Sequence, residues 1–240
     1  MLEFKTHRPR SKHIQVPIAK LEGQAAPAPR WPARLAGALG AYSVDLRPLA
    51  AALSAASKPL FVIGGGAAKA GADLASVLEA CGAACFETYA GRGVVPWDHP
   101  LNFRAALARP SSAQIVAEAD CVVAIGTELA EVDLWRSHLG HSCPLYRIDI
   151  DPECLADMQH AEVAIHARAE DAMASLRPLM AASPSQWKAK LVAHQRELWQ
   201  GETEAERPGI IAIVEALWAV VPDDAMIYSD MTQFAYVANE

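Results

Sequence analysis

Apolar runs and amphipathic stretches alternate through residues 45–182, and this alternation is the strongest pattern in the chain. Apolar runs of about four to eight residues indicate buried strands, and apolar residues at three- and four-residue spacing indicate helices. The predicted strands are residues 60–63, 85–88, 121–125, 145–150 and 163–165. The predicted helices are one capped by Asp45, one ending near Gly82, and residues 113–119, 170–180, 185–200 and 210–221.

Strands that are apolar throughout are buried on both faces, and the helices between them are the crossovers of a parallel sheet. We therefore predict an α/β fold with a doubly wound parallel sheet of about six strands. Two more strands are predicted outside this domain. Residues 13–18 alternate in polarity and are closed by Pro17, and residues 225–228 run into Ser229 and Asp230. Residues 23–44 are rich in Ala, Pro and Gly, which predicts a semi-stiff linker.

Composition and charge narrow the class of protein. The chain has 240 residues, 52% of them hydrophobic, which is enough to bury a core without disulfides or metal. A formal net charge of −7 argues against nucleic acid as a partner, because a phosphate-binding surface needs clustered Lys and Arg. The five cysteines are odd in number and widely spaced, which is typical of a reducing compartment. With no signal peptide and no apolar stretch near the ~20 residues of a membrane span, we expect a soluble cytoplasmic protein without a membrane partner.

Three predicted strands end in glycines or a carboxylate, at the edge where open α/β sheets bind ligands. The triplet Gly64, Gly65 and Gly66 follows the first strand and precedes a helix, so it forms either a phosphate loop or a tight turn. Gly126 and Thr127 end the third strand. Together these strand ends favour a nucleotide-sized cleft over three unrelated turns.

Two carboxylates end the fourth strand. Asp151 precedes Pro152, a combination that favours capping of the next helix. Asp149 can accept hydrogen bonds from ribose hydroxyls or serve as a cap, and the sequence leaves both open.

Residues 229–233 follow the last predicted strand and form either a ligand loop or a helix cap, of which the cap is favoured. The eight histidines suggest no metal site, and no Gly-x-Ser-x-Gly motif occurs, so we assign neither catalytic nor metal-binding residues.

Several of these segments together resemble the thiamine-diphosphate enzymes of the acetolactate synthase and 2-oxoacid decarboxylase superfamily. Residues 91–101 resemble that family's Gly-Lys-Gly-x-x-Pro-x-x-His-Pro-Leu stretch, with Arg92 in place of the usual lysine. Residues 58–66, 119–127 and 148–152 resemble three strand ends of its central domain, residues 8–17 the last strand of its pyrimidine-binding domain, and residues 227–233 the opening of its diphosphate-binding domain.

The resemblance implies an organisation and a set of ligands. The implied parts are the end of a pyrimidine-binding domain (1–22), a linker (23–44), a central nucleotide-binding-type domain (45–182), a linker helix (183–207) and the start of a diphosphate-binding domain (208–240). The implied cofactors are thiamine diphosphate and Mg²⁺ for the whole enzyme, with FAD or ADP as a candidate ligand of the central domain. The implied substrate is a 2-oxoacid, and the whole enzyme is expected to be a homodimer or homotetramer, whereas the fragment is expected to be monomeric. The candidate cofactor-binding residues are Gly64, Gly65, Gly66, Thr88, Gly126, Thr127, Asp149, Asp230 and Gln233.

Departures from the family pattern bear on activity. The family's catalytic glutamate belongs to a domain before residue 1, and no Gly-Asp-Gly metal motif occurs in the sequence. Residues 167–169 are Ala-Arg-Ala where the family usually has Gly-Asp, which puts nucleotide binding in question. We therefore expect a fragment that is inactive alone. A free-standing FAD-, ADP- or NAD-binding regulatory module and a structural spacer without ligand are the alternatives.

Overall fold

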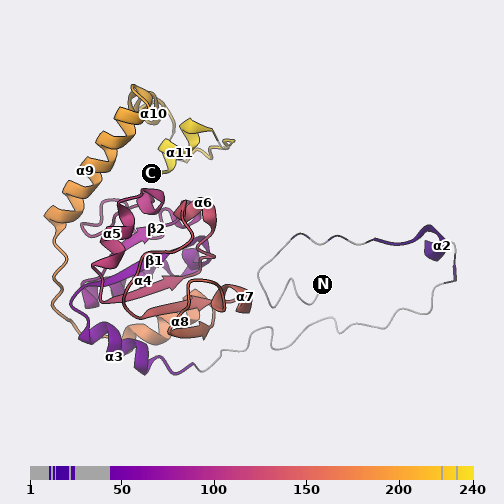
Figure 1. Cartoon of the computed structure of the whole chain (residues 1–240), viewed down its shortest axis with the longest axis horizontal. Coiled ribbons are helices and arrows are strands. Elements are labelled where there is room, and N and C mark those ends of the chain that lie inside the picture. The colour runs from indigo at the N-terminus through magenta and orange to yellow at the C-terminus, as the bar shows by residue number, and fades with distance from the viewer. Residues whose placement is uncertain are drawn as a thin grey trace. The chain divides into compact units, whose positions relative to one another are not determined.

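The computed structural model describes residues 11, 13, 15–21, 23, 24, 44–222, 224–230 and 232–240. Contacts divide the chain into two units, residues 1–43 and residues 44–240. In the first unit the structure describes one short helix, α2 (Ile18–Leu21). The second unit contains the sheet and the helices around it (Figure 1).

Five parallel strands form the sheet, in the order β2-β1-β3-β4-β5. They are β1 (Pro59–Ile63), β2 (Ala84–Glu87), β3 (Cys121–Ile125), β4 (Leu145–Asp149) and β5 (Val163–His166). Every residue of β1, β2 and β3 is buried, as expected for strands covered on both faces. The chain moves outward in one direction from β1 to β2 and in the other from β3 to β5, so the order switches between β1 and β3.

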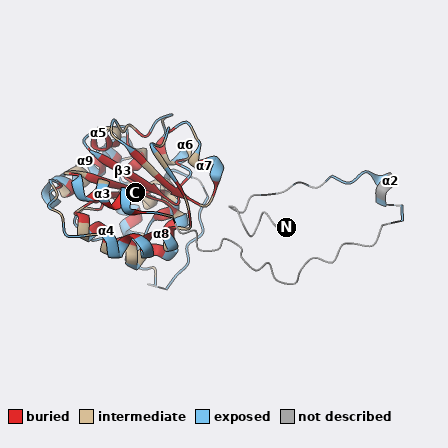
Figure 2. Ribbon diagram, turned by 90° about the horizontal axis from the view of Figure 1, so that it is seen from below, coloured by how far each residue is buried: buried red, intermediate tan, exposed pale blue. Residues whose placement is uncertain are grey.

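Helices α3 (Arg47–Ala55), α4 (Gly71–Cys81) and α8 (Ala169–Leu176) cover one face of the sheet (Figure 1). Their apolar residues, among them Leu53, Leu74 and Met173, pack with Phe61 and Val123 of the strands. The 3-10 helix η1 (Gly65–Ala70) leads from β1 into α4, and η4 (Arg177–Leu179) follows α8. Figure 2 shows the buried residues concentrated in the sheet and on the inner sides of these helices.

The opposite face is covered by α5 (Ser112–Ala117), α6 (Glu131–Leu134) and α9 (Ala189–Glu206). Trp187 and Trp199 are anchors of this side, because both are buried with Phe86 and Phe103. The Phe86 and Phe103 rings stack at 4.8 Å, and Trp187 meets Phe103 edge-on at 5.9 Å. Helices on both faces confirm the predicted doubly wound α/β fold.

The remaining elements are short helices around the sheet. They are η2 (Tyr89–Gly91), η3 (Ala106–Ala108), α7 (Pro152–Leu155), α10 (Ile210–Trp218) and α11 (Gln233–Asn239). The open edge of β2 is covered by residues 101–104, since the Cys85 N–H donates to the Leu101 carbonyl at 3.0 Å and the Phe103 N–H to the Cys85 carbonyl at 2.7 Å. This pairing protects an edge that would otherwise expose unpaired backbone groups.

The predicted element boundaries mostly agree with the structure. All five strands of the predicted domain are present, and Asp45 accepts a hydrogen bond from the N–H of Arg47, where α3 begins, at 3.0 Å. The predicted helix 185–200 begins later, at Ala189, and continues to Glu206. The predicted helix 170–180 is α-helical only as far as Leu176. The 3-10 helix η4, which contains Pro178, follows it.

The sheet has five strands, in keeping with the prediction of about six. Two other predictions about strands are wrong. The described residues of 13–18 form no strand, and Ile18 begins α2 instead. Residues 225–228 are also not a strand, and Met226 and Tyr228 are 76% and 87% exposed. A strand needs a neighbour for its backbone groups, and residues 225–228 pair with no other strand in the described part of the chain. The predicted linker 23–44 lies mainly outside the described residues.

Candidate functional site

The carboxyl ends of all five strands lie at one edge of the sheet because the strands are parallel. In sheets with the order 2-1-3-4-5, ligands bind where the order switches, between the first and third strands. Here that position is flanked by the loop after β1 (Gly64–Gly66) and the loop after β3 (Gly126 and Thr127). The structure therefore brings five of the nine predicted cofactor-binding residues to the switch point.

The two glycine loops at the switch point pack backbone against backbone. The Gly64 N–H donates to the Ile125 carbonyl and the Gly66 N–H to the Gly126 carbonyl, both at 2.9 Å. A Cβ on Gly64 would lie 2.2 Å from the Gly126 carbonyl oxygen. Gly126 itself has φ +60°, a conformation that favours glycine. The absence of side chains at these positions lets the two loops touch.

Thr88 directly follows β2 and holds the next turn against β1. Its N–H donates to the Ile63 carbonyl at 2.9 Å, and its hydroxyl accepts from the Gly91 N–H at 3.2 Å. A Cβ on Gly91 would lie 2.1 Å from the Ile63 carbonyl oxygen, so this turn also needs glycine. The buried Thr88 thus acts as an N-cap at this edge.

Thr127 is fixed by a buried arginine. Its hydroxyl accepts from the Leu129 N–H at 2.9 Å, and its carbonyl accepts from Arg147 Nη2 at 2.7 Å. Arg147, on β4, is 1% exposed and also forms a 2.5 Å ion pair with Asp157. Arg147 was not among the residues predicted from the sequence, although a charged residue inside an otherwise apolar strand is a signal for a buried partner.

The carboxylates after β4 confirm the favoured interpretation for Asp151. Its Oδ1 accepts from the Glu153 N–H at 3.0 Å and caps α7. Asp149 is buried, and its Oδ1 accepts from the Asp151 N–H at 2.9 Å. A ribose-binding role for Asp149 remains a prediction.

Asp230 and Gln233 are the two candidates that do not lie at the end of a strand of the sheet. Both side chains are exposed, and within the described residues neither bonds to another candidate. Thr232 is the N-cap of α11, so the favoured helix-cap interpretation of residues 229–233 is confirmed.

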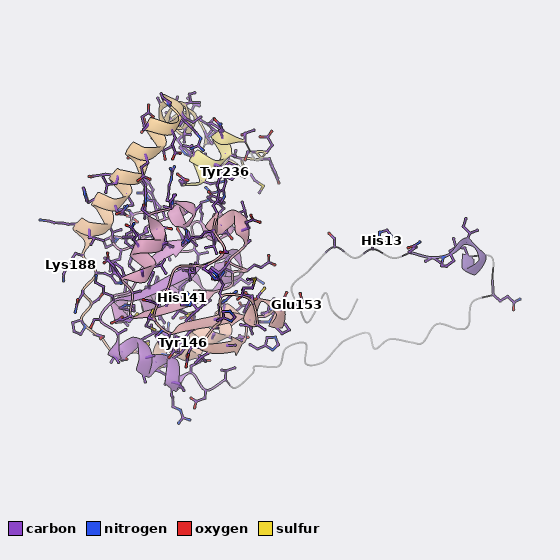
Figure 3. All side chains as sticks on the ribbon, viewed as in Figure 1. His13, His141, Tyr146, Glu153, Lys188 and Tyr236 are labelled. Carbon is purple, nitrogen blue, oxygen red and sulfur yellow. The ribbon has the colours of Figure 1, made fainter. Side chains whose placement is uncertain are left out.

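Helix α11 reaches this edge through an aromatic group that the sequence analysis did not single out. Tyr236, labelled in Figure 3, lies 6.0 Å from Tyr89 and 5.7 Å from Trp135, measured between ring centroids. Burial, together with the nearby Glu240 carboxylate, raises the pKa of Tyr89 to about 12. The position of Tyr89, directly after Thr88 at a strand end, was the available signal in the sequence.

A protein-family model described as "Thiamine pyrophosphate enzyme, central domain" matches residues 46–176, which is more than half of the chain. The chain belongs to the thiamine pyrophosphate enzymes. The matched residues contain the whole five-stranded sheet, so the central domain of this family is the domain described above.

Curated proteins of the same family are similar along nearly the whole chain. The "Probable 2-ketoarginine decarboxylase AruI" of Pseudomonas aeruginosa is 37% identical over 98% of this chain and 43% of its own length. The acetolactate synthase isozyme 1 large subunit of Escherichia coli is 28% identical over 92% of this chain and 40% of its own length. The chain thus spans less than half the length of these thiamine pyrophosphate enzymes.

Two further proteins are similar to this chain. The pyruvate oxidase of Lactiplantibacillus plantarum is 25% identical over 90% of this chain and 38% of its own length. A solved structure from Mycobacterium smegmatis, described as that of a candidate thiamin diphosphate-dependent enzyme, covers 57% of this chain and 28% of its own at 23% identity and a TM-score of 0.48.

Two buried cysteines of the chain, Cys81 and Cys121, are poor nucleophiles. All five are free thiols, and four are buried. Burial raises the pKa of Cys81 to about 11 and that of Cys121 to about 12, so both stay protonated at neutral pH.

Neither a metal cluster nor a membrane-spanning helix occurs among the described residues. They contain no group of three or more His, Cys, Asp or Glu that could hold a metal ion. None of the helices they form has the length and apolar character needed to cross a bilayer.

Proposed function

We propose that this chain supplies the central domain of a larger thiamine-diphosphate-dependent enzyme that acts on 2-oxoacids, as a decarboxylase or as an acetolactate-synthase-like carboligase. The similarity to a 2-ketoarginine decarboxylase carries this proposal, since it extends over 98% of the chain at 37% identity. The family match of residues 46–176 supports it independently.

The domain organisation belongs to the same proposal. Residues 45–182 are the central domain, residues 1–22 and 208–240 are parts of the pyrimidine- and diphosphate-binding domains, and residues 23–44 and 183–207 connect them. The whole enzyme is a cytoplasmic homodimer or homotetramer in this proposal, and the 240-residue chain is a monomer.

The described residues do not fit a Mg²⁺–diphosphate site. They gather no cluster of acidic ligands, and Asp230 and Gln233 are exposed. Thiamine diphosphate supplies an electron sink for carbanions next to a carbonyl when it is bound. We assign no step of that chemistry to this chain.

The first test is an assay of the purified 240-residue chain. With thiamine diphosphate and Mg²⁺ added, we expect no CO₂ release from 2-ketoarginine, pyruvate or branched 2-oxoacids. Turnover that survives repurification would contradict the proposal that the chain is inactive alone.

The second test asks whether the domain functions in a complete enzyme. Residues 45–182 replace the matching domain of the Pseudomonas 2-ketoarginine decarboxylase, and the chimaera is assayed for 2-ketoarginine decarboxylation. We expect a folded chimaera with measurable activity. A chimaera that has native-like circular dichroism and the oligomeric state of its parent but no activity would count against the proposal.

Nucleotide binding at the switch point is the second candidate function. The position of the Gly64–Gly66 loop beside Gly126 and Thr127 favours it, because α/β sheets with this strand order bind ligands there. FAD, ADP or NAD that binds the folded chain should raise its melting temperature. At a ligand concentration one hundred times Kd, binding adds about 2.7 kcal/mol to the free energy of unfolding. A flat response to all three ligands would support a spacer without ligand.

The variant for this test is Asp149→Asn, which keeps the side-chain shape and an oxygen acceptor. Gly65→Glu is unsuitable because a Cβ on Gly65 would lie 2.9 Å from the Ala90 carbonyl oxygen. If Asp149 binds ribose, Asp149→Asn weakens nucleotide binding while the melting temperature without ligand changes little.

A further inference from the structure

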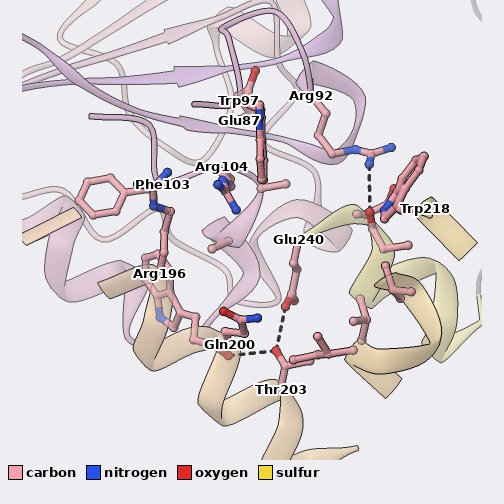
Figure 4. A pocket seen from close by; sticks show the side chains of 18 of the residues that line it. Glu87, Arg92, Trp97, Phe103, Arg104, Arg196, Gln200, Thr203, Trp218 and Glu240 are labelled. Carbon is pink, nitrogen blue, oxygen red and sulfur yellow. Dashed lines mark hydrogen bonds between the residues drawn. The ribbon is translucent and has the colours of Figure 1, made fainter. Parts of the chain in front are cut away.

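A pocket of about 790 Å³ lies between the β2 side of the sheet and helices α9, α10 and α11 (Figure 4). This volume is within the usual range of roughly 300–1,000 Å³ for small-molecule sites. Its walls are largely apolar and include Phe103, Trp199, Val214 and Trp218. None of the nine predicted cofactor-binding residues lines it, so the pocket is distinct from the switch point.

Three arginines line this pocket. Arg92 donates to the backbone carbonyls of Tyr89 and Ala238, whereas Arg104 and Arg196 have no acidic partner among the described residues. Arg104 extends from the segment beside β2, and Arg196 from α9 (Figure 4). The Arg104 guanidinium lies 3.9 Å from the centre of the Trp97 ring, and its Nε is buried without a hydrogen-bond partner. Within the described residues, neither arginine forms an ion pair with a carboxylate.

Arg196 lies close enough to Arg104 for its positive charge to disfavour the charged form of Arg104. The pKa of Arg104 is lowered, first by burial and further by the nearby Arg196. Two like charges at a partly buried wall repel each other, and an anion between them would relieve this repulsion.

The carboxylates that line the pocket are engaged elsewhere or solvated. Glu240 accepts from Arg109 Nε at 3.0 Å and from the Thr203 hydroxyl at 3.3 Å. Buried Glu87 accepts from the Val95 N–H at 3.0 Å and from Asn102 Nδ2 at 3.1 Å. Glu215 is exposed. Among the described residues none of these carboxylates forms an ion pair with Arg104 or Arg196, so the two guanidinium groups are left without a counter-charge of their own.

The backbone holds Arg104 in an uncommon conformation. Its φ is +63°, which is rare for a residue other than glycine. Its N–H donates to Asn102 Oδ1 at 2.7 Å, and its carbonyl accepts from the Glu87 N–H at 2.9 Å. Residues held in such conformations cluster at ligand-binding sites.

We propose that this pocket binds a small organic anion, with Arg104 and Arg196 holding a carboxylate or phosphate group and the apolar walls holding the rest of the ligand. Guanidinium groups suit both anions because they donate paired hydrogen bonds. This site is separate from the proposed 2-oxoacid chemistry and from the nucleotide candidate, and it does not depend on either.

Isothermal titration of the whole chain with four phenyl compounds that differ in the charge of the head group tests the charge requirement. The probes are benzoate, phenyl phosphate, neutral benzamide and cationic benzamidinium, all at the same ionic strength. We expect an anion to bind about ten- to a hundredfold more tightly than benzamide, and benzamidinium to bind no better than benzamide. Comparing benzoate with phenyl phosphate decides between a carboxylate and a phosphate ligand.

Variants then locate the site. Arg196→Gln and Arg104→Asn each weaken anion binding by about tenfold or more, and Asn tolerates the positive φ of residue 104. Lys190→Gln removes one exposed positive charge from the same helix away from the pocket and leaves anion binding unchanged. The proposal fails if neither anion binds better than benzamide, or if Arg196→Gln and Lys190→Gln, both folded by circular dichroism, bind the anion equally well.

Discussion

Gly64 and Gly126 show most directly how single residues set the candidate site. Their loops touch through hydrogen bonds of 2.9 Å, and a Cβ on Gly64 would come within 2.2 Å of the Gly126 carbonyl oxygen. No real Cβ contact is that short, so the backbone must move to accept a side chain. The close approach of the two loops depends on glycine at this position.

Gly64→Ala should therefore destabilise the domain. We expect a loss of about 1–3 kcal/mol in the free energy of unfolding, the usual cost of overpacking, measured by urea denaturation. Gly201→Ala is the matched control, because Gly201 is an exposed residue within α9 and has open space around its Cβ position. That change should stabilise the chain by about 0.5–1 kcal/mol. Equal effects of the two substitutions would refute the packing argument.

The sequence was sufficient to select these glycines but not to show what they contact. Gly64 and Gly126 both follow apolar strands, which made them candidates. Their mutual contact depends on β1 pairing with β3, and that pairing is a property of the sheet. Likewise, the lack of an acidic partner for Arg104 depends on which carboxylates other residues hold, and no local pattern in the sequence gives this.

At the scale of elements, α9 is fixed to the domain through Trp199, within the helix, and Trp187, two residues before it. Trp187 Nε1 donates to the carbonyl of Pro59, the first residue of β1, at 2.7 Å. Trp199 Nε1 donates to the Ser111 hydroxyl at 2.7 Å. Each indole thus combines a buried ring with a satisfied polar group.

Trp187→Phe should loosen this attachment. The ring remains apolar, but the Pro59 carbonyl loses its indole donor, which costs about 1–3 kcal/mol. Urea denaturation measures the loss. The conservative control is Trp218→Phe, since Trp218 is 54% exposed and has no such hydrogen bond among the described residues. A Trp187→Phe variant as stable as this control would show that the hydrogen bond contributes nothing.

Elements with strong periodicity were predicted well, and elements that depend on a neighbour were not. β1, β3 and β4 appear as predicted because buried apolar runs in an α/β chain form strands. Residues 225–228 have the composition of a strand and yet form no regular secondary structure. Strand propensity records how well residues fit a sheet, so it does not produce a strand where no sheet is adjacent.

At the scale of the whole second unit, the C-terminal residues are held by one ion-pair network. Arg109, whose side chain is 6% exposed, pairs with Glu240 at 2.5 Å and with Glu206 at 3.2 Å. Arg92 Nη1 also donates to the Ala238 carbonyl at 3.3 Å. Together these contacts connect α11 and the end of α9 to the segments after η2 and η3.

Glu240→Gln should release α11 while the sheet stays intact. Losing a charge-assisted hydrogen bond of about 1.5 kcal/mol corresponds to amide exchange about tenfold faster in residues 233–239. Hydrogen exchange read by mass spectrometry measures this locally. Glu202→Gln, an exposed change on α9, is the control and should leave exchange unchanged. Faster exchange across β1 and β3 as well would mean that the network supports the entire fold.

The strand order also determines when each strand can pair with its neighbours during synthesis of the chain. β1 lies in the middle of the sheet and pairs with β3, whose residues are made about sixty positions later. At translation rates of about 5–20 residues per second, β1 spends roughly three to twelve seconds without its second neighbour. During that time an almost wholly apolar segment depends on β2 and its helices, or on chaperones, to avoid other partners. Slow codons between residues 64 and 120 would lengthen this exposure, so the yield of folded protein should depend on codon choice in that interval.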